Sequence, residues 1–305
     1  MKILILSKYA PIYREEIQAA QPGVEILLPG DSGADEAEIA LGEPLLLREY
    51  LPRLKRLRWI QSTFAGVEPL LQAGLRRDYT LTNARGVFGG LMSEYIFGYL
   101  LAHERKIFQR WQAQREKRWD DSLTGTLRGK TLGLLGVGSI GAALAQTAKY
   151  FGMTVRGFTR ASEACPQVDE YFHPPLTASF AEGLDYLVSV LPNTPGTQRV
   201  VDAALLAALP QRALFINVGR GSAVDEAALV SALEAGAISG AVLDVTGQEP
   251  LPAESPLWGV KNLLLTFHTS APSFPKELAQ MFLDNYRRYA AGEPLRHVVN
   301  FEAGY

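Results

Sequence analysis

Three polar residues of this 305-residue chain each stand a few positions after a short apolar run, as side chains at the ends of buried parallel strands do. They are Arg220, Glu249 and His268. An arginine can hold a carboxylate and polarise a carbonyl, an imidazole can donate a proton, and a carboxylate can orient that imidazole and favour its protonated form. Together the three suit the reduction of a 2-keto acid. Taken singly, they also fit a surface arginine, a loop turn at Glu249-Pro250 and a core histidine.

The glycine-rich segment Gly136–Gly141 is a candidate dinucleotide site. It stands between the apolar run Leu132–Leu135 and an alanine-rich stretch, an order that predicts strand, turn and helix. In that context Gly136 allows a tight turn, Gly138 lets the backbone approach a pyrophosphate, and Gly141 lets the helix pack on the strand. Amide groups at the helix N-terminus, at Ser139 and Ile140, would bind the phosphates. The alternative is a glycine-rich turn without a ligand.

Arg160 occupies the position after the second predicted strand, where dinucleotide-binding domains distinguish NAD from NADP. The apolar run Thr154–Phe158 predicts the second strand, and an acidic residue after it would bind the ribose 2′-hydroxyl of NAD. No Asp or Glu occurs between Gly141 and Arg160. An arginine here suits the 2′-phosphate of NADP, which we therefore expect as cofactor, with NAD as the alternative. The competing interpretation makes Arg160 a solvated loop residue.

Six short apolar runs predict the strands that would position these side chains, and the stretches between them are long enough for helices. The runs are Thr131–Leu135, Thr154–Phe158, Tyr186–Val190, Ala213–Asn217, Ala241–Asp244 and Leu263–Thr266. This alternation is typical of a doubly wound parallel sheet, whose ligands bind beyond the carboxyl ends of the strands.

The N-terminal part predicts a second, smaller α/β unit. The apolar runs Ile3–Leu6 and Val24–Leu28 flank a helical pattern at Ile12–Ala20, and the alternation continues through Trp59–Ser62 and Tyr79–Asn83. Apolar residues recur at helical spacing over Ser93–Trp119, which predicts one or two helices bridging the domains. A further helix is predicted near Ser273–Tyr289.

In the order of its motifs, nearly the whole chain resembles the D-isomer-specific 2-hydroxyacid dehydrogenase family. Besides the glycine segment, the resemblance rests on Leu191–Pro195, Asn217–Glu226, Glu249-Pro250 and His268. Arg220 precedes Glu249 by 29 positions, and Glu249 precedes His268 by 19. The resemblance implies that Arg220, Glu249 and His268 are the catalytic residues and that Arg220 also binds substrate.

The resemblance implies further contacts and a domain plan. Ala65 and Gly66 look like the loop that binds the substrate carboxylate. Cofactor contacts would also come from loops after the strands, at Leu191, Pro192, Val218, Gly219, Asp244 and Ser270. The family implies an α/β protein with two doubly wound parallel-sheet domains and a homodimer. A Rossmann dinucleotide-binding domain would span residues 99–270, and a smaller, flavodoxin-like substrate domain would combine residues 1–98 with 271–305.

Three features resemble the glyoxylate/hydroxypyruvate reductase branch of the family: Arg160, Leu251–Trp258 and the Gly304-Tyr305 end. That branch implies NAD(P)H-dependent reduction of a small 2-keto acid, such as glyoxylate or hydroxypyruvate, to the D-2-hydroxy acid. The hydride would come from the nicotinamide and the proton from His268. A function of another class is a non-enzymatic NAD(P)-sensing protein of the same fold, which would need none of the catalytic residues.

Composition limits the partners. Thirty Lys and Arg residues stand against 32 Asp and Glu, and the net charge of −2 argues against the broad basic surface that nucleic acid requires. The single cysteine, Cys165, fits a reducing compartment. We recognise no signal peptide and no membrane span, so we expect a soluble, cytoplasmic protein. No Cys/His cluster suggests a metal site.

Overall fold

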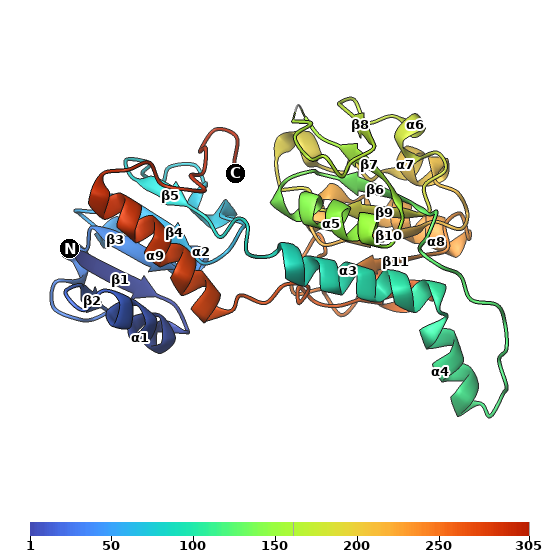
Figure 1. Ribbon diagram of the computed structural model, residues 1–305, viewed down its shortest axis with the longest axis horizontal. Helices are drawn as coiled ribbons and strands as arrows, with labels where there is room; N and C mark the ends of the chain where they lie inside the picture. Colours follow the sequence, from blue (N-terminus) through green and yellow to red (C-terminus); the bar gives the residue numbers. More distant parts are fainter. Residues whose placement is uncertain (161, 305) are drawn as a thin grey trace. The chain divides into compact units, whose positions relative to one another are not determined.

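The chain folds into two compact units in the computed structural model, which describes residues 1–160 and 162–304 (Figure 1). One unit combines residues 1–87 with residues 272–305, and the other spans residues 88–271. The smaller unit is therefore discontinuous in sequence. Tyr305, the last residue of the family-like carboxyl end, lies outside the described residues.

The division falls at residues 87/88 and 271/272, whereas the sequence placed it at 98/99 and 270/271. The reason is helix α3, which runs without interruption over Gly89–Glu104. It packs against helix α5 (Ser139–Tyr150) of the larger unit, with Ile96 and Leu100 buried. A continuous helix buried against one partner belongs to that partner's unit, so residues 89–98 join the larger unit.

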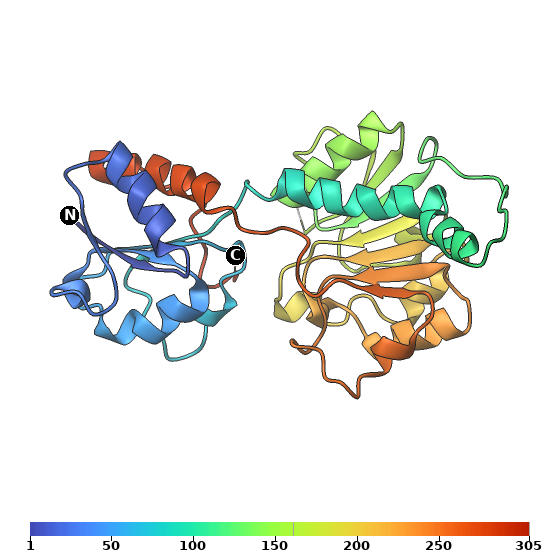
Figure 2. The same ribbon diagram turned by 90° about the horizontal axis from the view of Figure 1, so that it is seen from below.

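The smaller unit is built on a sheet of five parallel strands. These are β1 (Lys2–Leu6), β2 (Glu25–Leu27), β3 (Ile39–Gly42), β4 (Trp59–Ser62) and β5 (Thr80–Thr82). Their order in the sheet, β2-β1-β3-β4-β5, is the flavodoxin-like order, as predicted. Helices α1 (Ala10–Ala20) and α9 (Pro275–Ala291) pack together on one face, and α2 (Pro44–Tyr50) covers the other (Figure 2).

The C-terminal helix α9 is tied to this sheet by specific contacts. The ring of Phe282 stacks on that of Trp59, with centroids 5.2 Å apart. The amide of Asn285, which is 1% exposed, donates to Gln61 Oε1 at 3.2 Å, and its oxygen accepts from the backbone N–H of Arg296 at 2.8 Å. Buried polar groups are costly unless they are paired, so this network fixes how the C-terminal segment returns to the first unit.

The larger unit is built on a sheet of seven parallel strands. These are β6 (Thr131–Leu135), β7 (Thr154–Phe158), β8 (Glu170–Phe172), β9 (Tyr186–Ser189), β10 (Leu214–Asn217), β11 (Gly240–Leu243) and β12 (Leu263–Leu265). The order β8-β7-β6-β9-β10-β11-β12 is the predicted doubly wound arrangement, extended by one strand. Helices α3 and α5 cover one face (Figure 2).

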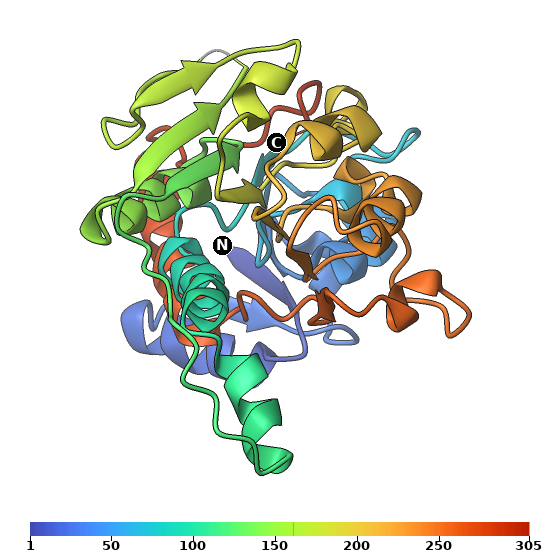
Figure 3. The same cartoon turned by 90° about the vertical axis from the view of Figure 1, so that its right-hand side faces the viewer.

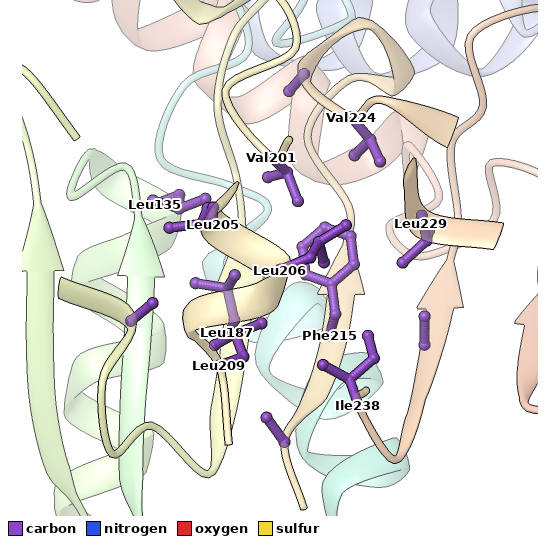
Figure 4. Close-up of a cluster of buried hydrophobic side chains, with 14 of the residues drawn as sticks. Leu135, Leu187, Val201, Leu205, Leu206, Leu209, Phe215, Val224, Leu229 and Ile238 are labelled. Atoms are coloured by element: carbon purple, nitrogen blue, oxygen red, sulfur yellow. The ribbon is translucent and has the colours of Figure 1, made fainter. Parts of the chain in front are cut away.

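The other face of this sheet carries the short helix α6 (Ala178–Ala181), together with α7 (Ala203–Ala208) and α8 (Glu226–Glu234). Between helices and strands lies a hydrophobic cluster that includes Leu187 and Phe215 from strands and Leu206 from α7 (Figure 4). Burying an aliphatic or aromatic side chain of this size stabilises a fold by roughly 1.5–3 kcal/mol. The cluster therefore holds β6, β9 and β10, whose carboxyl ends carry candidate site residues.

Helix α4 (Ile107–Arg115) extends from the end of α3 and projects away from the sheet of its own unit (Figures 1 and 3). Of its residues only Ala113 is buried. Ile107, Phe108 and Trp111 are each more than half exposed. The predicted bridging segment thus forms two helices, and the second leaves apolar surface in solvent.

Three elements escaped prediction. Strand β3 is the four-residue segment Ile39–Gly42, and it leads after one residue into the short helix α2. Strand β8, Glu170–Phe172, lies at the edge of the larger sheet with no fully buried residue. Segments this short carry little periodicity, and an edge strand needs no apolar run.

Candidate active site

A glycine turn joins β6 to α5 at the centre of the larger sheet. Gly136 has a φ of +103°, which other residues rarely adopt. A Cβ at Gly141 would lie 2.2 Å from the carbonyl oxygen of Gly136. By contrast, a Cβ at the exposed Gly138 would meet no atom within 4 Å. The fold itself therefore explains the glycines at 136 and 141, whereas the space beside Gly138 is open to a ligand.

The N-terminus of α5 opens onto the same turn. Gly138 is the N-cap of this 12-residue helix, and Ser139 and Ile140 are its first two residues. The first amide groups of a helix have no acceptor within it, and they carry a partial positive charge. Such amides beside an open backbone position are suited to the phosphates of a dinucleotide. These residues fit NAD and NADP alike.

Two neighbouring loops carry further predicted cofactor contacts. Leu191 and Pro192 follow β9, and Val218 and Gly219 follow β10. A Cβ at Gly219 would lie 2.6 Å from the backbone nitrogen of Leu191, so the two loops touch. Strand β9 pairs with β6, where the strand order reverses, and ligands of such sheets bind at that reversal. The structure therefore brings these residues to the edge that carries the glycine turn.

Arg160 is exposed and follows β7 after one intervening residue. The only acidic residue close after it, Glu163, is engaged by His173, whose Nε2 lies 2.7 Å from Glu163 Oε1. The Nδ1 atom of His173 bonds the carbonyl oxygen of Thr159 at 2.9 Å. The hydrogen bond to Glu163 raises the pKa of His173, so the histidine partly offsets the negative charge of Glu163. The loop therefore suits a bound anion near Arg160 even though it contains the acidic residue Glu163.

A buried asparagine shapes the loop that carries Arg220. Asn217 is fully buried at the end of β10, and its amide nitrogen donates to the carbonyl oxygen of Arg220 at 3.0 Å. Its oxygen accepts from the N–H of Gly219 at 3.2 Å. The Arg220 Nη1 atom donates to the carbonyl oxygen of Gly219 at 2.8 Å. The guanidinium is therefore anchored at one nitrogen in a half-buried position just beyond the strand.

Glu249 and His268 form a direct pair. His268 Nδ1 lies 2.8 Å from Glu249 Oε2, and Glu249 Oε1 accepts from the backbone N–H of Thr246 at 3.0 Å. A carboxylate only accepts hydrogen bonds, which assigns a proton to Nδ1. The Nε2 atom is then the one that can exchange a proton with another molecule. The His268 side chain is 56% exposed, so that atom is accessible in the described part of the chain.

Asp244 holds the turn that presents His268. Its Oδ1 accepts from the Thr266 hydroxyl and from the N–H of Thr269, both at 2.8 Å, and its Oδ2 accepts from the N–H of Ser270 at 3.1 Å. Its carbonyl oxygen accepts from the N–H of His268 at 2.6 Å. Asp244 is 2% exposed, so these bonds form in a buried environment. The predicted cofactor residues Asp244 and Ser270 thus meet, and in this structure they also shape the turn.

The same turn carries backbone strain. Phe267 and His268 both have left-handed φ values, 57° and 58°. For residues with a Cβ that conformation costs about 1–2 kcal/mol each. The bonds made by Asp244 offset this cost, and the turn places the imidazole opposite Glu249.

A tyrosine on α3 extends this network. The hydroxyl of Tyr95 bonds that of Thr266, which in turn donates to Asp244. Burial raises the pKa of Tyr95; the hydrogen bond with Thr266 lowers it and the negative charge of Asp244 raises it further. Burial and the same carboxylate also raise the pKa of Tyr99. Both phenols therefore stay neutral around pH 7.

The loops of Arg220 and Glu249 are in contact. A Cβ at Gly221 would lie 1.9 Å from the carbonyl carbon of Thr246, so the two backbones approach as closely as glycine allows. Thr246 also binds the Glu249 carboxylate through its N–H. Strands β10, β11 and β12 are neighbours in the sheet, so the loops after them share one edge. The structure thus gathers the loops of the three predicted catalytic residues at that edge.

Sequence reasoning missed residues that hold these loops. Glu226, the first residue of α8, accepts from the N–H of Gly247 at 2.6 Å and so fastens the loop that carries Glu249. Asn217 and Glu226 lie within the motif Asn217–Glu226, but the motif alone predicts no role for either residue, and Thr246 lies outside the quoted motifs. A signal for Asn217 exists, because a polar residue at the end of an otherwise apolar strand needs a buried partner.

The loop with Ala65 and Gly66 belongs to the smaller unit, where it follows β4. Its shape is fixed by Asn83, whose amide nitrogen donates to the carbonyl oxygen of Ala65 at 2.8 Å. Within the described residues, the buried hydroxyl of Thr63 and the oxygen of Asn83 have no hydrogen-bond partner.

The described residues offer neither a metal site nor a helix that could span a membrane. No group of three or more His, Cys, Asp or Glu side chains in residues 1–160 and 162–304 is placed to hold a metal ion. No described helix is both long and apolar enough to cross a membrane.

Residues 97–270 match the model of the D-isomer specific 2-hydroxyacid dehydrogenase NAD binding domain, which is more than half of the chain. The chain belongs to this family. As a D-isomer specific 2-hydroxyacid dehydrogenase, it is an oxidoreductase. The match covers β6–β12 and contains the glycine turn, Arg220, Glu249 and His268.

Relatives of this dehydrogenase extend the comparison. It is 34% identical over 225 residues to glyoxylate/hydroxypyruvate reductase A of Klebsiella pneumoniae, covering 71% of this chain and 70% of that protein. A family member from Aeromonas salmonicida has a solved structure with a TM-score of 0.91 at 41% identity, covering 98% of this chain and 99% of that one. Another, from Xanthobacter autotrophicus, was solved with NADPH and MES; its TM-score is 0.91 at 34% identity, covering 100% and 99%. The predicted family and fold are confirmed.

Proposed function

We propose that this dehydrogenase reduces a small 2-keto acid, of the glyoxylate or hydroxypyruvate type, to the D-2-hydroxy acid at the expense of NADPH. The observation that carries the proposal is the 2.8 Å pair of His268 and Glu249 on the sheet edge that also carries the glycine turn. The names of the relatives support the substrate class, and the NADPH bound to the Xanthobacter autotrophicus protein supports the cofactor. No observation favours the non-enzymatic sensor.

The chain's residues divide the work of the reaction. NADPH, when bound, supplies the hydride to the carbonyl carbon. Arg220 would bind the substrate carboxylate and polarise the carbonyl, because a guanidinium offers parallel donors to both oxygens of a carboxylate. His268 would deliver the proton to the carbonyl oxygen from Nε2, while Glu249 holds Nδ1 and stabilises the imidazolium. Ala65 and Gly66 would offer backbone N–H groups to the carboxylate. Hydride and proton together convert the ketone to the alcohol.

The direct test is consumption of NADPH with a panel of 2-keto acids. We expect glyoxylate and hydroxypyruvate to be reduced faster than larger keto acids, as followed by the absorbance of NADPH. A protein that binds NADPH yet turns over none of the panel would behave as a sensor, and the reductase proposal would fail. Repeating the panel with NADH measures cofactor preference in the same experiment.

Gly138 tests the cofactor site separately from the fold. Gly138→Ala should leave the melting temperature unchanged, because the added methyl meets no protein atom within 4 Å. It should weaken NADPH binding by roughly tenfold or more, because the methyl occupies space that a bound pyrophosphate needs and weakens charge-assisted bonds to the amides. Calorimetric titration and thermal melting give the two readouts.

Gly141→Ala is the matched control for this experiment. Its methyl would lie 2.2 Å from a backbone oxygen, so we expect a lower melting temperature. Unchanged NADPH affinity in Gly138→Ala would remove the glycine turn from the cofactor site.

Arg160 tests the choice of cofactor. Arg160→Asp should raise the KM for NADPH by roughly tenfold to a hundredfold and improve the use of NADH, because a charge-assisted contact to the 2′-phosphate is lost. Arg156→Gln is a suitable control, because Arg156 lies on β7 itself and pairs with Glu170 of the neighbouring strand β8 at 2.9 Å. Kinetics with both cofactors decide the matter. A wild-type preference for NADH would show the assignment to be wrong.

We also infer a cytoplasmic homodimer. Ile107, Phe108 and Trp111 on α4 are 52–57% exposed, and Trp119 and Leu123 after it are 89% and 90% exposed. So much apolar surface on one projecting segment is typical of a protein interface, and a second copy is the partner that the family implies. The single cysteine fits a reducing compartment.

Sedimentation equilibrium tests the dimer. The expected mass is twice the 33.4 kDa of the chain, and Trp111→Glu should shift the protein toward the monomer. A wild-type mass equal to one chain would contradict the inference.

A further inference from the structure

A cationic cavity lies in the smaller unit, on the opposite edge of its sheet from the Ala65-Gly66 loop. It has a volume of about 780 Å³. Its walls come from residue 38 before β3, residues 55–58 before β4 and residues 76–80 at the start of β5. These segments precede their strands, whereas Ala65 and Gly66 follow β4. In a parallel sheet the two ends of the strands form opposite edges, so this cavity is separate from the substrate loop of the same unit.

The lining of the cavity is strongly charged. Five cationic side chains face two carboxylates, and Leu57 is the one aliphatic side chain among the lining residues. The cations are Lys55, Arg56, Arg58, Arg76 and Arg77. Like charges gathered around one cavity repel each other, and a bound anion relieves that repulsion. A lining of this kind disfavours the mostly apolar ligands that fill typical pockets of this size.

Two of the arginines are held in place. Arg76 makes a bidentate pair with Asp78, at 2.6 and 2.7 Å, and its Nη1 donates to the carbonyl oxygen of Leu54. Arg77 donates to the carbonyl oxygen of Leu71 at 3.2 Å and lies over the ring of Phe301. Side chains fixed in advance lose little entropy when a ligand arrives. One wall is therefore built before binding.

The other three cations keep their full bonding capacity. Lys55, Arg56 and Arg58 are exposed, and within the described residues their side chains make no hydrogen bond or ion pair. Arg53, three residues before Arg56, is paired instead with Asp35 at 3.1 Å and lies over the ring of Tyr50. The unpaired cations of this segment are thus the ones that line the cavity.

We propose that this cavity binds a small anionic ligand through a pyrophosphate group. Two linked phosphoryl groups carry on the order of three negative charges, which matches the excess of five cations over two carboxylates. Their many acceptor oxygens suit the guanidinium groups of Arg56, Arg58 and Arg77, because guanidinium binds phosphate bidentately, whereas Arg76 is already paired with Asp78. The group could come from free pyrophosphate or from a nucleoside diphosphate. This site belongs to the smaller unit, whereas the cofactor site belongs to the larger unit, and the proposal does not rest on the proposed reaction.

The test is calorimetric titration of the NADPH-saturated protein with inorganic pyrophosphate and, separately, with ADP. Saturation with NADPH keeps these ligands from the glycine turn. We expect binding of at least one of them, with an affinity that falls as salt rises. The double variant Arg56→Gln/Arg58→Gln should weaken that binding by about tenfold or more. The ratio of the two Kd values shows whether a nucleoside adds contacts.

Arg53→Gln is the matched control, because it removes one cation of the same segment outside the cavity. It should change the affinity by less than about twofold, since only a screened, longer-range charge is lost. The melting temperature of each variant shows that it is folded. Absence of binding of both ligands to the wild type, or an equal loss of affinity in Arg53→Gln and the double variant, would overturn the proposal.

Discussion

Replacing His268 with alanine should lower kcat for keto-acid reduction by roughly a hundredfold to ten-thousandfold, which is the usual contribution of a positioned general acid. NADPH affinity should stay within about twofold of the wild type, because the glycine turn and the α5 N-terminus are untouched. The measurements are steady-state kinetics and calorimetric titration. His268 Nδ1 is hydrogen-bonded to Glu249, so Nε2 is the atom that can give a proton to the substrate, and alanine has no such atom.

The left-handed backbone at this position calls for a second variant. His268 has a φ of 58°, a conformation that asparagine adopts more readily than alanine. His268→Asn should therefore preserve the turn and still lack a proton donor. If His268→Asn retains wild-type kcat, His268 is not the general acid. If only His268→Ala is impaired, the residue serves the turn and not the proton transfer.

Glu249→Gln is expected to lower kcat by roughly tenfold to a hundredfold, because the charge-assisted bond to His268 contributes about 1.5–3 kcal/mol. In the wild type, Glu249 Oε2 accepts from His268 Nδ1 at 2.8 Å, which leaves Nε2 to deliver the proton. A glutamine side chain can present its amide nitrogen to Nδ1 instead, and then it no longer holds the proton on that atom. NADPH affinity should change little, because the glycine turn is untouched.

The experiment compares kcat of the wild type, Glu249→Gln and the control Glu254→Gln at saturating NADPH. Glu254 is an exposed carboxylate of the same loop and makes no hydrogen bond or ion pair in the described chain. Its loss should leave kcat unchanged. Equal kcat values for the wild type and Glu249→Gln would show that Glu249 does not act on His268 in the reaction.

Arg220→Lys should lower kcat/KM for the keto acid by about a hundredfold or more. Lysine keeps the charge but loses the planar fork that binds a carboxylate and a carbonyl together, and each charge-assisted bond lost costs about 1.5–3 kcal/mol. NADPH affinity should change little. Asn217 still holds the loop backbone in this variant, so a folding defect is not expected.

The kinetics also tell how Arg220 acts. A rise in KM with kcat unchanged would assign Arg220 to substrate binding alone, whereas a fall in kcat would assign it to the transition state as well. An unaltered kcat/KM would remove Arg220 from the site.

Much of the candidate site could be located from the sequence, because strand ends are local features. Apolar runs locate β6, β10, β11 and β12, and the residues just beyond them include the glycine turn, Arg220, Glu249 and His268. The contacts between those loops were not readable, since they depend on the order of strands in the sheet. Gly221 shows this: it must be glycine because Thr246 approaches it, and Thr246 belongs to a different strand's loop.

Other features were hidden for reasons of length or conformation. Strands β3 and β8 are four and three residues long, too short for a clear period. The two consecutive left-handed residues, Phe267 and His268, carry no local signal, because glycine and asparagine are the usual markers of that conformation. The bonds from Asp244, which follows β11, and the bond from the Thr269 hydroxyl to the carbonyl oxygen of Thr266 hold this turn.

The most direct test of the proposed reaction follows the hydrogen atom itself. Hydroxypyruvate is incubated with the protein and NADPH that carries deuterium at both positions of C4 of the nicotinamide, and the glycerate formed is analysed by mass spectrometry and chiral chromatography. The account predicts D-glycerate with one deuterium at C2 for each NADPH consumed. L-glycerate, glycerate without deuterium, or no consumption of NADPH would contradict it.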